Sequence, residues 1–506
     1  MGLRDFTIYD VILRNQRHAS GQLAFVSGQE RITHAEFATR VDRLASGLGQ
    51  AGVLPGDRIA VLADNCLEYV CLYGAVARIG AVLVPINSRA IGDEIHHVLS
   101  DTEPRLVVAG DSYQDAIVAL RGGLTFVEHF FSLGNGPIAL EPFSLLMQGQ
   151  TLGPPADVSD TSPYVILYTA AVDGRPRGAV LTHRSLIAGS MQLTHYWRMG
   201  ANDVNLCALP LFHLAGLTLL LATLQAGGMS VVVPRFEAQA AAHTIRRERV
   251  TTMGVFPPML GRVLDCAANS PADLSSLRTL TGLDTPETIA RLEKVCPDAR
   301  FWSGYGQSEV SGYVSLGKFR ERPGSAGRAA LHSNVAIVDE FDNPVPPGQT
   351  GEIVVRGPGV FQGYWNRPTE TAETLRGNWH HSGDLGRLDD DGYLWFEGRS
   401  PAKELIKPGG ENVYPAEVER VIVQHPAIAQ AVVIGVPDAE WGEAIKAVCM
   451  IRAGHQISEQ AVIEFVAARI ARHKKPRFVV FVDALPVTSA GIMDRTKVKT
   501  DYGTQQ

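Results

Sequence analysis

Apolar positions in the first part of the chain fall into short runs separated by amphipathic segments. Residues 58–63 (RIAVLA), 80–87 (GAVLVPIN) and 105–110 (RLVVAG) are apolar and bounded by Gly, Pro or charge, which is typical of buried strands. Thr33 and Glu36 have the spacing of a capping box, and apolar residues follow at helical spacing. This alternation predicts an α/β fold with largely parallel sheets.

The last hundred residues have a different pattern. Residues 415–424 are expected to form a helix that begins with proline, and residues 458–474 an amphipathic helix with Ser458 as its N-cap. Strands are expected at 429–436, 444–451 and 477–485. These elements predict a compact α+β module, and the Gly-, Pro- and charge-rich segment 398–404 marks its boundary.

Length, composition and charge narrow the classes of protein that fit. A chain of 506 residues with 45% hydrophobic and 20% charged residues predicts a globular enzyme of two or more domains. The net charge of -7 argues against a nucleic-acid partner. Six scattered cysteines without metal or redox spacing indicate a reducing, cytoplasmic setting. The N-terminus lacks an apolar signal core, and the apolar stretch 214–226 is too short to span a membrane, so a buried helix is expected there.

Five segments in fixed order carry the candidate chemistry. They are LPLFHLAG (209–216), YGQSE (305–309), GEIVVRGPGVFQGYWNRP (351–368), SGDLG (382–386) and GGENVYPAEVE (409–419). Together they resemble the adenylate-forming (ANL) superfamily of acyl-CoA synthetases, luciferases and peptide-synthetase adenylation domains, over nearly the whole chain.

The resemblance implies a domain organisation and a two-step reaction. It divides the chain into a large acyl-adenylate-binding domain (1–398), a hinge (399–404) and a small mobile lid (405–506). In such enzymes an acid and ATP first give acyl-AMP and pyrophosphate. Acyl-AMP and coenzyme A then give the thioester and AMP, after the lid has rotated.

The resemblance also assigns the adenylate site. Tyr305, with Gly306, corresponds to the aromatic residue that stacks on adenine, and Ser308 to a hydroxyl donor to the α-phosphate. Glu309 corresponds to a carboxylate that holds magnesium, a cation that prefers oxygen ligands. Asp384 corresponds to the acceptor of both ribose hydroxyls.

Further residues are assigned to the hinge and to the acyl and thiol sites. Arg399 resembles the basic residue near the hinge that contacts ribose and phosphate, although the hinge is two residues longer than usual and Lys403 could be the pivot. His213 resembles the histidine at the mouth of the acyl pocket. Gly409 and Gly410 resemble the lid loop along the pantetheine tunnel, where glycine allows a thiol arm to pass close to the backbone. For the basic end at 474–477, a solvated helix terminus is expected rather than contacts with coenzyme A phosphates.

One departure from the family concerns the loop that holds the β- and γ-phosphates. Ala170 and Ala171 stand where Ser and Gly are expected, Val172 and Asp173 where two hydroxyl residues are expected, and Arg177 where Lys is expected. Valine donates no hydrogen bond, and an aspartate beside a polyphosphate repels it. The substituted loop therefore predicts that the protein uses ATP only weakly.

A second departure lies near the C-terminus. Gly491 is followed by Ile492, where the family has the lysine that bridges the carboxylate and the α-phosphate during adenylation, and a one-residue deletion would give the same string. Loss of one such charge-stabilising donor costs roughly 10²–10³ in rate. Lys497 and Lys499 are nearby but displaced, and the loop 281–287 (TGLDTPE) is shorter than in the family, which suggests an unusual acyl pocket.

The weakened groups serve adenylation, whereas the retained groups serve adenine, ribose, the α-phosphate and the thiol path. The hypothesis is a non-adenylating enzyme that performs only the thiolation step, with coenzyme A and the AMP moiety of acyl-AMP as ligands, magnesium possible and ATP doubtful. A partner ligase would then supply acyl-AMP, as in split acyl-CoA ligase pairs of natural-product (platensimycin-type) pathways. Three alternatives remain: a complete ATP-dependent acyl-CoA ligase, a non-catalytic acyl-AMP or coenzyme A binder, and an engineered substitution at residue 492.

Overall fold

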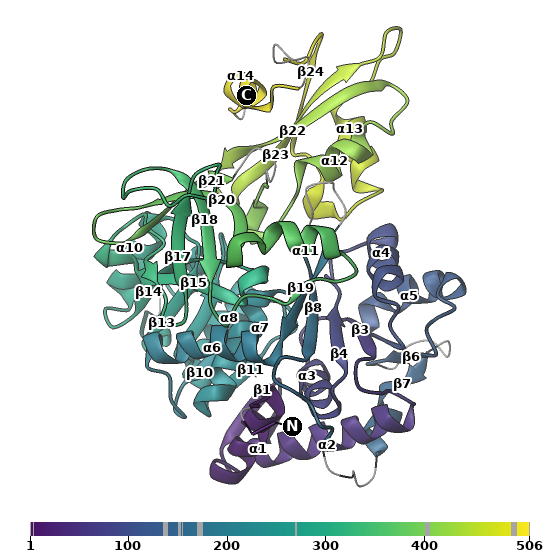
Figure 1. Cartoon of the computed structure of the whole chain (residues 1–506), viewed down its shortest axis with the longest axis vertical. Coiled ribbons are helices and arrows are strands. Elements are labelled where there is room, and N and C mark those ends of the chain that lie inside the picture. The colour runs from purple at the N-terminus through teal and green to yellow at the C-terminus, as the bar shows by residue number, and fades with distance from the viewer. Residues whose placement is uncertain are drawn as a thin grey trace.

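The computed structural model describes residues 2–3, 5–134, 140–149, 153, 155–169, 176–268, 271–399, 405–486 and 493–504. Figure 1 shows a large body, formed by the chain up to Arg399, with a small unit above it that contains the elements from α12 to α14. We call this small unit the lid. The prediction of a large α/β domain followed by a small α+β C-terminal domain is confirmed.

One large sheet of the body has the strand order β16-β15-β14-β13-β12-β10-β11-β1-β2. Pairings from β14 through β1 are parallel, and those at both edges are antiparallel. Its strands are β1 (Leu23–Ser27), β2 (Glu30–Thr33), β10 (Val204–Cys207), β11 (Met229–Val232), β12 (Thr252–Val255), β13 (Thr279–Gly282), β14 (Arg300–Gln307), β15 (Gly312–Lys318) and β16 (Arg328–Ala329).

The second large sheet has the order β19-β9-β8-β4-β3-β5-β6-β7 and is parallel from β8 to β7. The three apolar runs at 58–63, 80–87 and 105–110 form its central strands β3, β4 and β5, as predicted. Its strands are β3 (Arg58–Leu62), β4 (Val82–Pro85), β5 (Leu106–Ala109), β6 (His129–Ser132), β7 (Glu141–Pro142), β8 (Pro163–Thr169), β9 (Arg177–Thr182) and β19 (Gly363–Tyr364).

Helices connect and cover the parallel strands, because a parallel pair needs a crossover connection. Thr33 caps α2 with the predicted capping box, and α7 forms at the predicted apolar stretch and is buried over most of its length. No helix in the described part of the chain is both long and apolar enough to cross a membrane. The body helices are α1 (Ile8–His18), α2 (His34–Gln50), α3 (Leu67–Ile79), α4 (Gly92–Thr102), α5 (Gln114–Leu120), α6 (His183–Trp197), α7 (Leu214–Ala226), α8 (Ala238–Glu248), α9 (Met259–Cys266), α10 (Pro286–Val295) and α11 (Pro368–Thr374).

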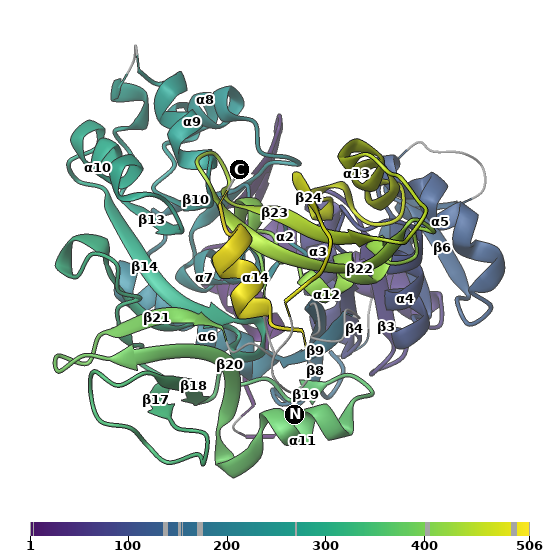
Figure 2. The same ribbon diagram turned by 90° about the horizontal axis from the view of Figure 1, so that it is seen from above.

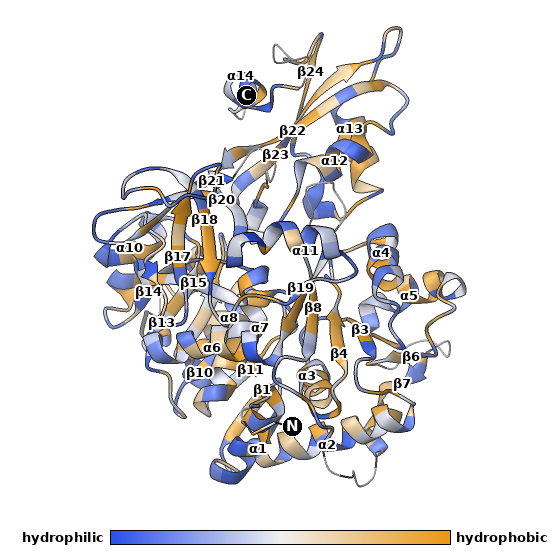
Figure 3. Cartoon of the chain, in the orientation of Figure 1, coloured by the Kyte–Doolittle hydropathy of each residue, from blue (hydrophilic) through white to orange (hydrophobic). Residues whose placement is uncertain are grey.

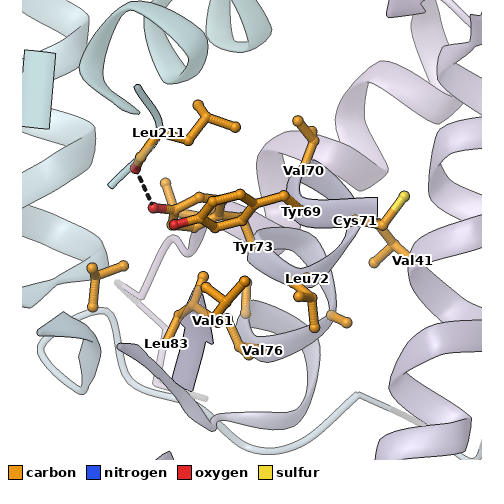
Figure 4. Close-up of a cluster of buried hydrophobic side chains, with 14 of the residues drawn as sticks. Val41, Val61, Tyr69, Val70, Cys71, Leu72, Tyr73, Val76, Leu83 and Leu211 are labelled. Atoms are coloured by element: carbon orange, nitrogen blue, oxygen red, sulfur yellow. Dashed lines mark hydrogen bonds between the residues drawn. The ribbon is translucent and has the colours of Figure 1, made fainter. Parts of the chain in front are cut away.

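The main core joins the two large sheets. Apolar residues gather along the inner strands in Figure 3. In Figure 4, Tyr69 and Tyr73 of α3 stack with their ring centroids 5.5 Å apart, and the Tyr73 hydroxyl donates to the Leu211 carbonyl at 2.7 Å. Leu211 follows β10 of the other sheet, so this contact links α3 to the other sheet.

A third sheet, of four antiparallel strands, was not anticipated from the sequence. It has the order β17-β18-β20-β21 and carries the SGDLG segment on its third strand. Strand β20 (HHSGDLGRL) is rich in polar residues and glycine, and β21 (LWFEGR) has a short apolar start, so neither shows the long apolar run that marks the parallel strands. Its strands are β17 (Asn334–Val338), β18 (Gly351–Arg356), β20 (His380–Leu388) and β21 (Leu394–Arg399).

The lid is a three-stranded sheet with helices, as the sequence predicts for the last hundred residues. Strands β22 (Ile428–Asp438) and β23 (Gly442–Ile451) are antiparallel, and β24 (Phe478–Val482) adds in parallel. Its helices are α12 (Pro415–Ile422), α13 (Glu459–Ala467) and α14 (Arg495–Tyr502). Ser458 caps α13, but this helix ends at Ala467 rather than continuing to residue 474. Figure 2 shows the lid lying across the body, between the β14 side and the β3–β4 side.

Candidate active site

A cavity of about 1670 Å³ lies where the two large sheets and the lid meet. Residues that directly follow β3, β4, β10, β11, β12 and β13 line it, so the carboxyl ends of parallel strands from both sheets face one space. Ligands of open α/β sheets bind at such edges. Single small ligands occupy pockets of roughly 300–1,000 Å³, so this cavity has room for two substrates.

The predicted site residues converge on this cavity. Every one of them except Glu309 lines it: His213, Tyr305, Gly306, Ser308, Asp384, Arg399, Gly409 and Gly410. The chain therefore places these groups together, while the role of each remains a prediction.

Asp384 is the centre of a hydrogen-bonded group on the body side. Its Oδ2 accepts from the Tyr305 hydroxyl and from Gln307 Nε2, both at 2.7 Å, and its Oδ1 lies 3.1 Å from Arg399 Nε. Burial and the nearby Asp384 carboxylate raise the pKa of Tyr305 well above its ordinary value, so the phenol stays protonated and donates. Gln307 was missed from the sequence, because nothing in its local pattern shows that it turns toward β20.

Gly306 has a structural reason to be glycine. A Cβ atom at this position would lie 1.9 Å from the Gly312 carbonyl oxygen on the neighbouring strand. The register of β14 and β15 also shifts between Tyr305 and Gly306. Glycine therefore lets β15 approach while the Tyr305 ring is held at the cavity wall.

Ser308 begins a short 3-10 helix (Ser308–Val310) immediately after β14 and lines the cavity. Glu309 is almost fully buried behind it, and its Oε1 accepts from the Tyr364 hydroxyl at 2.9 Å and from Thr169 Oγ1 at 3.3 Å. A carboxylate with a neighbouring hydroxyl is a donor set of the kind that magnesium takes. Glu309 remains the predicted magnesium ligand, with the Thr169 hydroxyl as its neighbour.

Arg177, which stands in place of the family lysine, packs over an aromatic ring. Its guanidinium carbon lies 4.3 Å from the centroid of Tyr364, the residue that donates to Glu309. The remaining substituted positions of the phosphate loop, Ala170, Ala171, Val172 and Asp173, lie outside the described residues, as do Lys403 and Ile492.

The lid loop meets the body at the cavity mouth. Gly409 and Gly410 have positive φ angles of 58° and 85°. A Cβ atom at Gly410 would lie 2.7 Å from the Phe256 ring, and one at Gly409 would lie 2.7 Å from Trp441. Both the backbone conformation and the close approach therefore require glycine here.

His213 is held by a buried carboxylate from the lid. Its Nε2 lies 3.0 Å from Glu411 Oε2, and Glu411 Oε1 lies 2.5 Å from an Arg89 guanidinium nitrogen. Burial would raise the pKa of Glu411, but His213 and Arg89 together hold it well below its ordinary range. Glu411 and Arg89 were missed from the sequence, since 198 residues separate Glu411 from His213.

Lys407 of the lid was not among the predicted site residues. It lines the cavity, and burial together with the nearby Arg399 lowers its pKa to about 8, against the opposing effect of Asp384 and Glu443. Its charge is therefore close to titration in the neutral to mildly alkaline range.

The expectation of a solvated basic terminus at 474–477 is wrong for Lys474. This residue is 8% exposed, and its ammonium pairs with Glu94 of the body and, at 2.7 Å, with Glu417 of the lid. Two carboxylates compensate the cost of burying the charge. The basic run looked solvated in sequence because its partners come from distant elements.

Among the described residues, one group of three carboxylate and imidazole ligands is close enough to hold a metal: Asp342, Glu352 and His381. Arg376 already pairs with both of these carboxylates, at 3.1 and 3.4 Å. Glu352 and His381 lie on the third sheet, the group is outside the cavity, and Arg376 offsets part of its negative charge.

The fold and the cavity define an adenylate-forming enzyme. The chain belongs to the AMP-binding enzyme family: the family model matches residues 13–365, and the model of the AMP-binding enzyme C-terminal domain matches residues 417–491.

Relatives match along the full length. Indoleacetate–CoA ligase of Aromatoleum aromaticum is 35% identical over 96% of both chains, and feruloyl-CoA synthase of Amycolatopsis sp. is 35% identical over 97% of this chain and 98% of its own. A crystal structure from Rhodopseudomonas palustris, provisionally described as a long-chain-fatty-acid CoA ligase, is 46% identical, with a TM-score of 0.76 over 79% of this chain and 100% of its own. The chain is thus an acyl-CoA ligase homologue.

Proposed function

We propose that this protein forms acyl-CoA thioesters, and that its proficient step is the transfer of an acyl group from acyl-AMP to coenzyme A. The observation that carries the proposal is the lid loop, where Gly410 lies against Phe256 and Gly409 against Trp441, while Glu411 bonds His213. These contacts support the proposal, because the residues that make them would line the path of the coenzyme A thiol.

The proposed reaction needs positioning rather than a protein nucleophile. The AMP moiety would lie against Tyr305, with its ribose hydroxyls at Asp384 and its phosphate toward Ser308. The sulfur of coenzyme A attacks the acyl carbonyl carbon, the bond from that carbon to the phosphate oxygen breaks, and AMP leaves. With its Nε2 hydrogen-bonded to Glu411, His213 in its neutral form would accept the thiol proton at Nδ1. Alignment of two bound substrates supplies much of the rate.

Weak adenylation is the finer part of the proposal. It rests on the sequence differences at 170–173 and 492 and on Arg177, whose guanidinium packs on Tyr364. A partner ligase would supply acyl-AMP in that case. Acyl-CoA ligases in general use coenzyme A, ATP and magnesium, so the second candidate is a complete ATP-dependent ligase. The full-length match to indoleacetate–CoA ligase favours it.

In the test, purified protein is incubated with coenzyme A and indoleacetyl-, feruloyl- or fatty-acyl-adenylates. Parallel reactions contain coenzyme A with the free acids, ATP and magnesium. Release of AMP and thioester are measured. Turnover of adenylates with at least hundredfold slower use of acid and ATP supports the proposal. Comparable turnover with ATP establishes the complete ligase, and adenylate binding without turnover establishes a non-catalytic binder.

The variant Ile492→Lys tests whether weak adenylation comes only from the missing lysine at this position or also from the phosphate loop. If the phosphate loop is itself deficient, this variant remains unable to use ATP. Full ATP-dependent activity in Ile492→Lys would show that the loop is competent and would contradict the thiolation-only proposal.

A further inference from the structure

One side of the cavity is apolar. Six cavity-lining residues of one hydrophobic cluster form it, and we call them the apolar wall: Leu193, Leu209, Leu219, Phe256, Met259 and Tyr313. In the described part of the chain, no charged residue of α6, α7, β13, β14 or β15 lines the cavity. An ionised group against this wall would be buried without a partner, which is costly, so the wall fits an uncharged acyl group.

The Tyr313 ring crosses from β15 over β14 to β13. Its Cδ1 and Cε1 atoms lie over Gly304, where a Cβ atom would be only 2.6 Å from Cδ1. Its hydroxyl reaches Thr281 of β13, whose Oγ1 donates to it at 3.0 Å. All three residues line the cavity, and glycine at position 304 leaves the room that the ring needs.

The Tyr313 hydroxyl has hydrogen-bonding capacity that the protein does not use. A tyrosine hydroxyl can both donate and accept. The bond with Thr281 is its one hydrogen bond in the described part of the chain, and Thr281 Oγ1 also lies 3.1 Å from the Trp302 carbonyl oxygen. Burial raises the pKa of Tyr313, against the opposing effect of the Thr281 hydroxyl, so the phenol stays protonated. An uncharged hydroxyl beside apolar side chains is the kind of group that orients a ligand in a pocket.

Strand register places this hydroxyl deeper in the body than the adenylate residues. Thr281 pairs with Trp302, which precedes Tyr305 by three residues along β14. Strands rise about 3.3 Å per residue, so Thr281 lies roughly 10 Å further from the carboxyl edge of the sheet than Tyr305. This separation leaves room for an aromatic ring between an acyl carbonyl at the adenylate residues and the Tyr313 hydroxyl.

We propose that the acyl group is aromatic and carries a ring hydroxyl, and that Tyr313 selects it through a hydrogen bond to that hydroxyl. This inference rests on the proposed function and names the substrate class of the same site. A ring hydroxyl donates or accepts, so it matches whichever capacity the bond with Thr281 leaves on Tyr313. A rigid ring also holds the hydroxyl at a fixed distance, with a smaller loss of conformational freedom than an alkyl chain.

The experiment compares ligands that differ in one group, with binding measured by calorimetry. The ligands are non-hydrolysable acylsulfamoyl adenosines with a phenylpropenoyl or phenylacetyl group that carries a hydroxyl or a methyl group at ring position 3 or 4. Wild type is expected to bind at least one hydroxyl compound roughly three- to tenfold more tightly than its methyl partner, as a net hydrogen bond gives. A saturated alkanoyl analogue of equal length is expected to bind more weakly than that hydroxyl compound.

Tyr313→Phe removes only the hydroxyl. The preference is expected to reverse in favour of the methyl compound, because the ligand hydroxyl would then be buried without a partner, while affinity for AMP stays unchanged. Tyr196→Phe is the matched control, since Tyr196 packs against Trp302 of the same cluster, with ring centroids 6.1 Å apart, and does not line the cavity. Equal losses for hydroxyl and methyl compounds in Tyr313→Phe would show a structural role and overturn the inference.

The comparison within wild type needs no variant, so it stays decisive if Tyr313→Phe does not fold. Tighter binding of the methyl or alkanoyl compounds by wild type would overturn the inference. If wild type binds AMP but prefers no hydroxyl compound, only the substrate class is wrong. If it binds neither AMP nor any analogue, the adenylate site itself is wrong and the proposed function fails as well.

Discussion

At the scale of single residues, Glu411 connects the lid to the proposed chemistry. Glu411→Gln keeps the size of the side chain but removes the charge that orients His213 and pairs with Arg89. General base groups contribute roughly 10²–10⁴-fold to rates. We expect thioester formation from acyl-AMP to fall at least tenfold, with AMP affinity unchanged, as measured by thioester release and calorimetry.

Glu440→Gln is the matched control for this prediction. Glu440 forms an exposed ion pair between lid and body, at 2.6 Å from Arg262, and does not contact His213. Equal losses in the two variants would mean that lid–body attraction, and not the orientation of His213, explains the effect.

His473 makes a pH-dependent contribution to folding stability where the lid meets the body. Burial lowers its pKa to about 4, with Lys474 and Arg89 adding to the effect and Glu411 and Glu94 opposing it. Between about pH 6.5, its ordinary pKa, and pH 4, the folded protein binds fewer protons than the unfolded chain. The stability that neutral His473 contributes is therefore fully present above about pH 6.5 and is lost on acidification.

The prediction is a shallower fall of the melting temperature between pH 6.5 and 4.5 in His473→Gln than in wild type, by roughly 2 °C. Thermal unfolding in a pH series measures it, with the exposed His455→Gln as control. Parallel curves for wild type and His473→Gln would refute the assignment.

At the scale of elements, the loop before α12 must present bare backbone to the body. In Gly410→Ala the new methyl group would lie 2.7 Å from the Phe256 ring at a φ of 85°. We expect thiolation to fall at least tenfold while AMP binding persists, because the clash moves the loop that lines the proposed thiol path. Half-reaction rates and calorimetry measure the two effects.

Gly454→Ala separates the clash from backbone strain. Gly454 has a similar φ of 78° in the lid, but a Cβ atom there would meet nothing within 4 Å. It is therefore expected to cost some stability through the left-handed backbone and to leave thiolation intact. A comparable loss of thiolation in Gly454→Ala would contradict a role for the close approach at Gly410.

At the scale of the whole molecule, a buried charge cluster holds the lid against the body. Lys474 pairs with Glu94 on α4 and with Glu417 on α12, and it is almost fully buried. Glu94→Gln removes the body's carboxylate and leaves a buried ammonium with one partner, which is costly in the docked state. We expect the lid to undock more often.

Small-angle scattering should then show a larger radius of gyration for Glu94→Gln, and thioester formation should fall roughly tenfold as the docked population falls. Glu128→Gln, which breaks an ion pair with Arg105 within the body, is the control. Unchanged scattering together with an unchanged rate would show that other contacts dock the lid.

Local signals were sufficient for much of the architecture. The capping box at Thr33, the apolar runs of β3, β4 and β5, the proline that begins α12 and the Ser458 cap of α13 act within a few residues, so the sequence predicted these elements. It did not predict the third sheet or the end of α13, because pairing with distant strands and packing against the lid core decide both.

The same distinction separates what the sequence determined about the site from what only the tertiary structure decided. Ordered motifs were enough to select eight residues that line the cavity, because each motif carries its signal in a few neighbouring positions. The network around Asp384 joins residues 79 apart, and the pair of His213 and Glu411 joins residues 198 apart. The burial of Lys474 likewise depends on partners from two other elements. Such contacts form only when separate elements pack, since neither the distance between two side chains nor their removal from water is fixed by spacing along the chain.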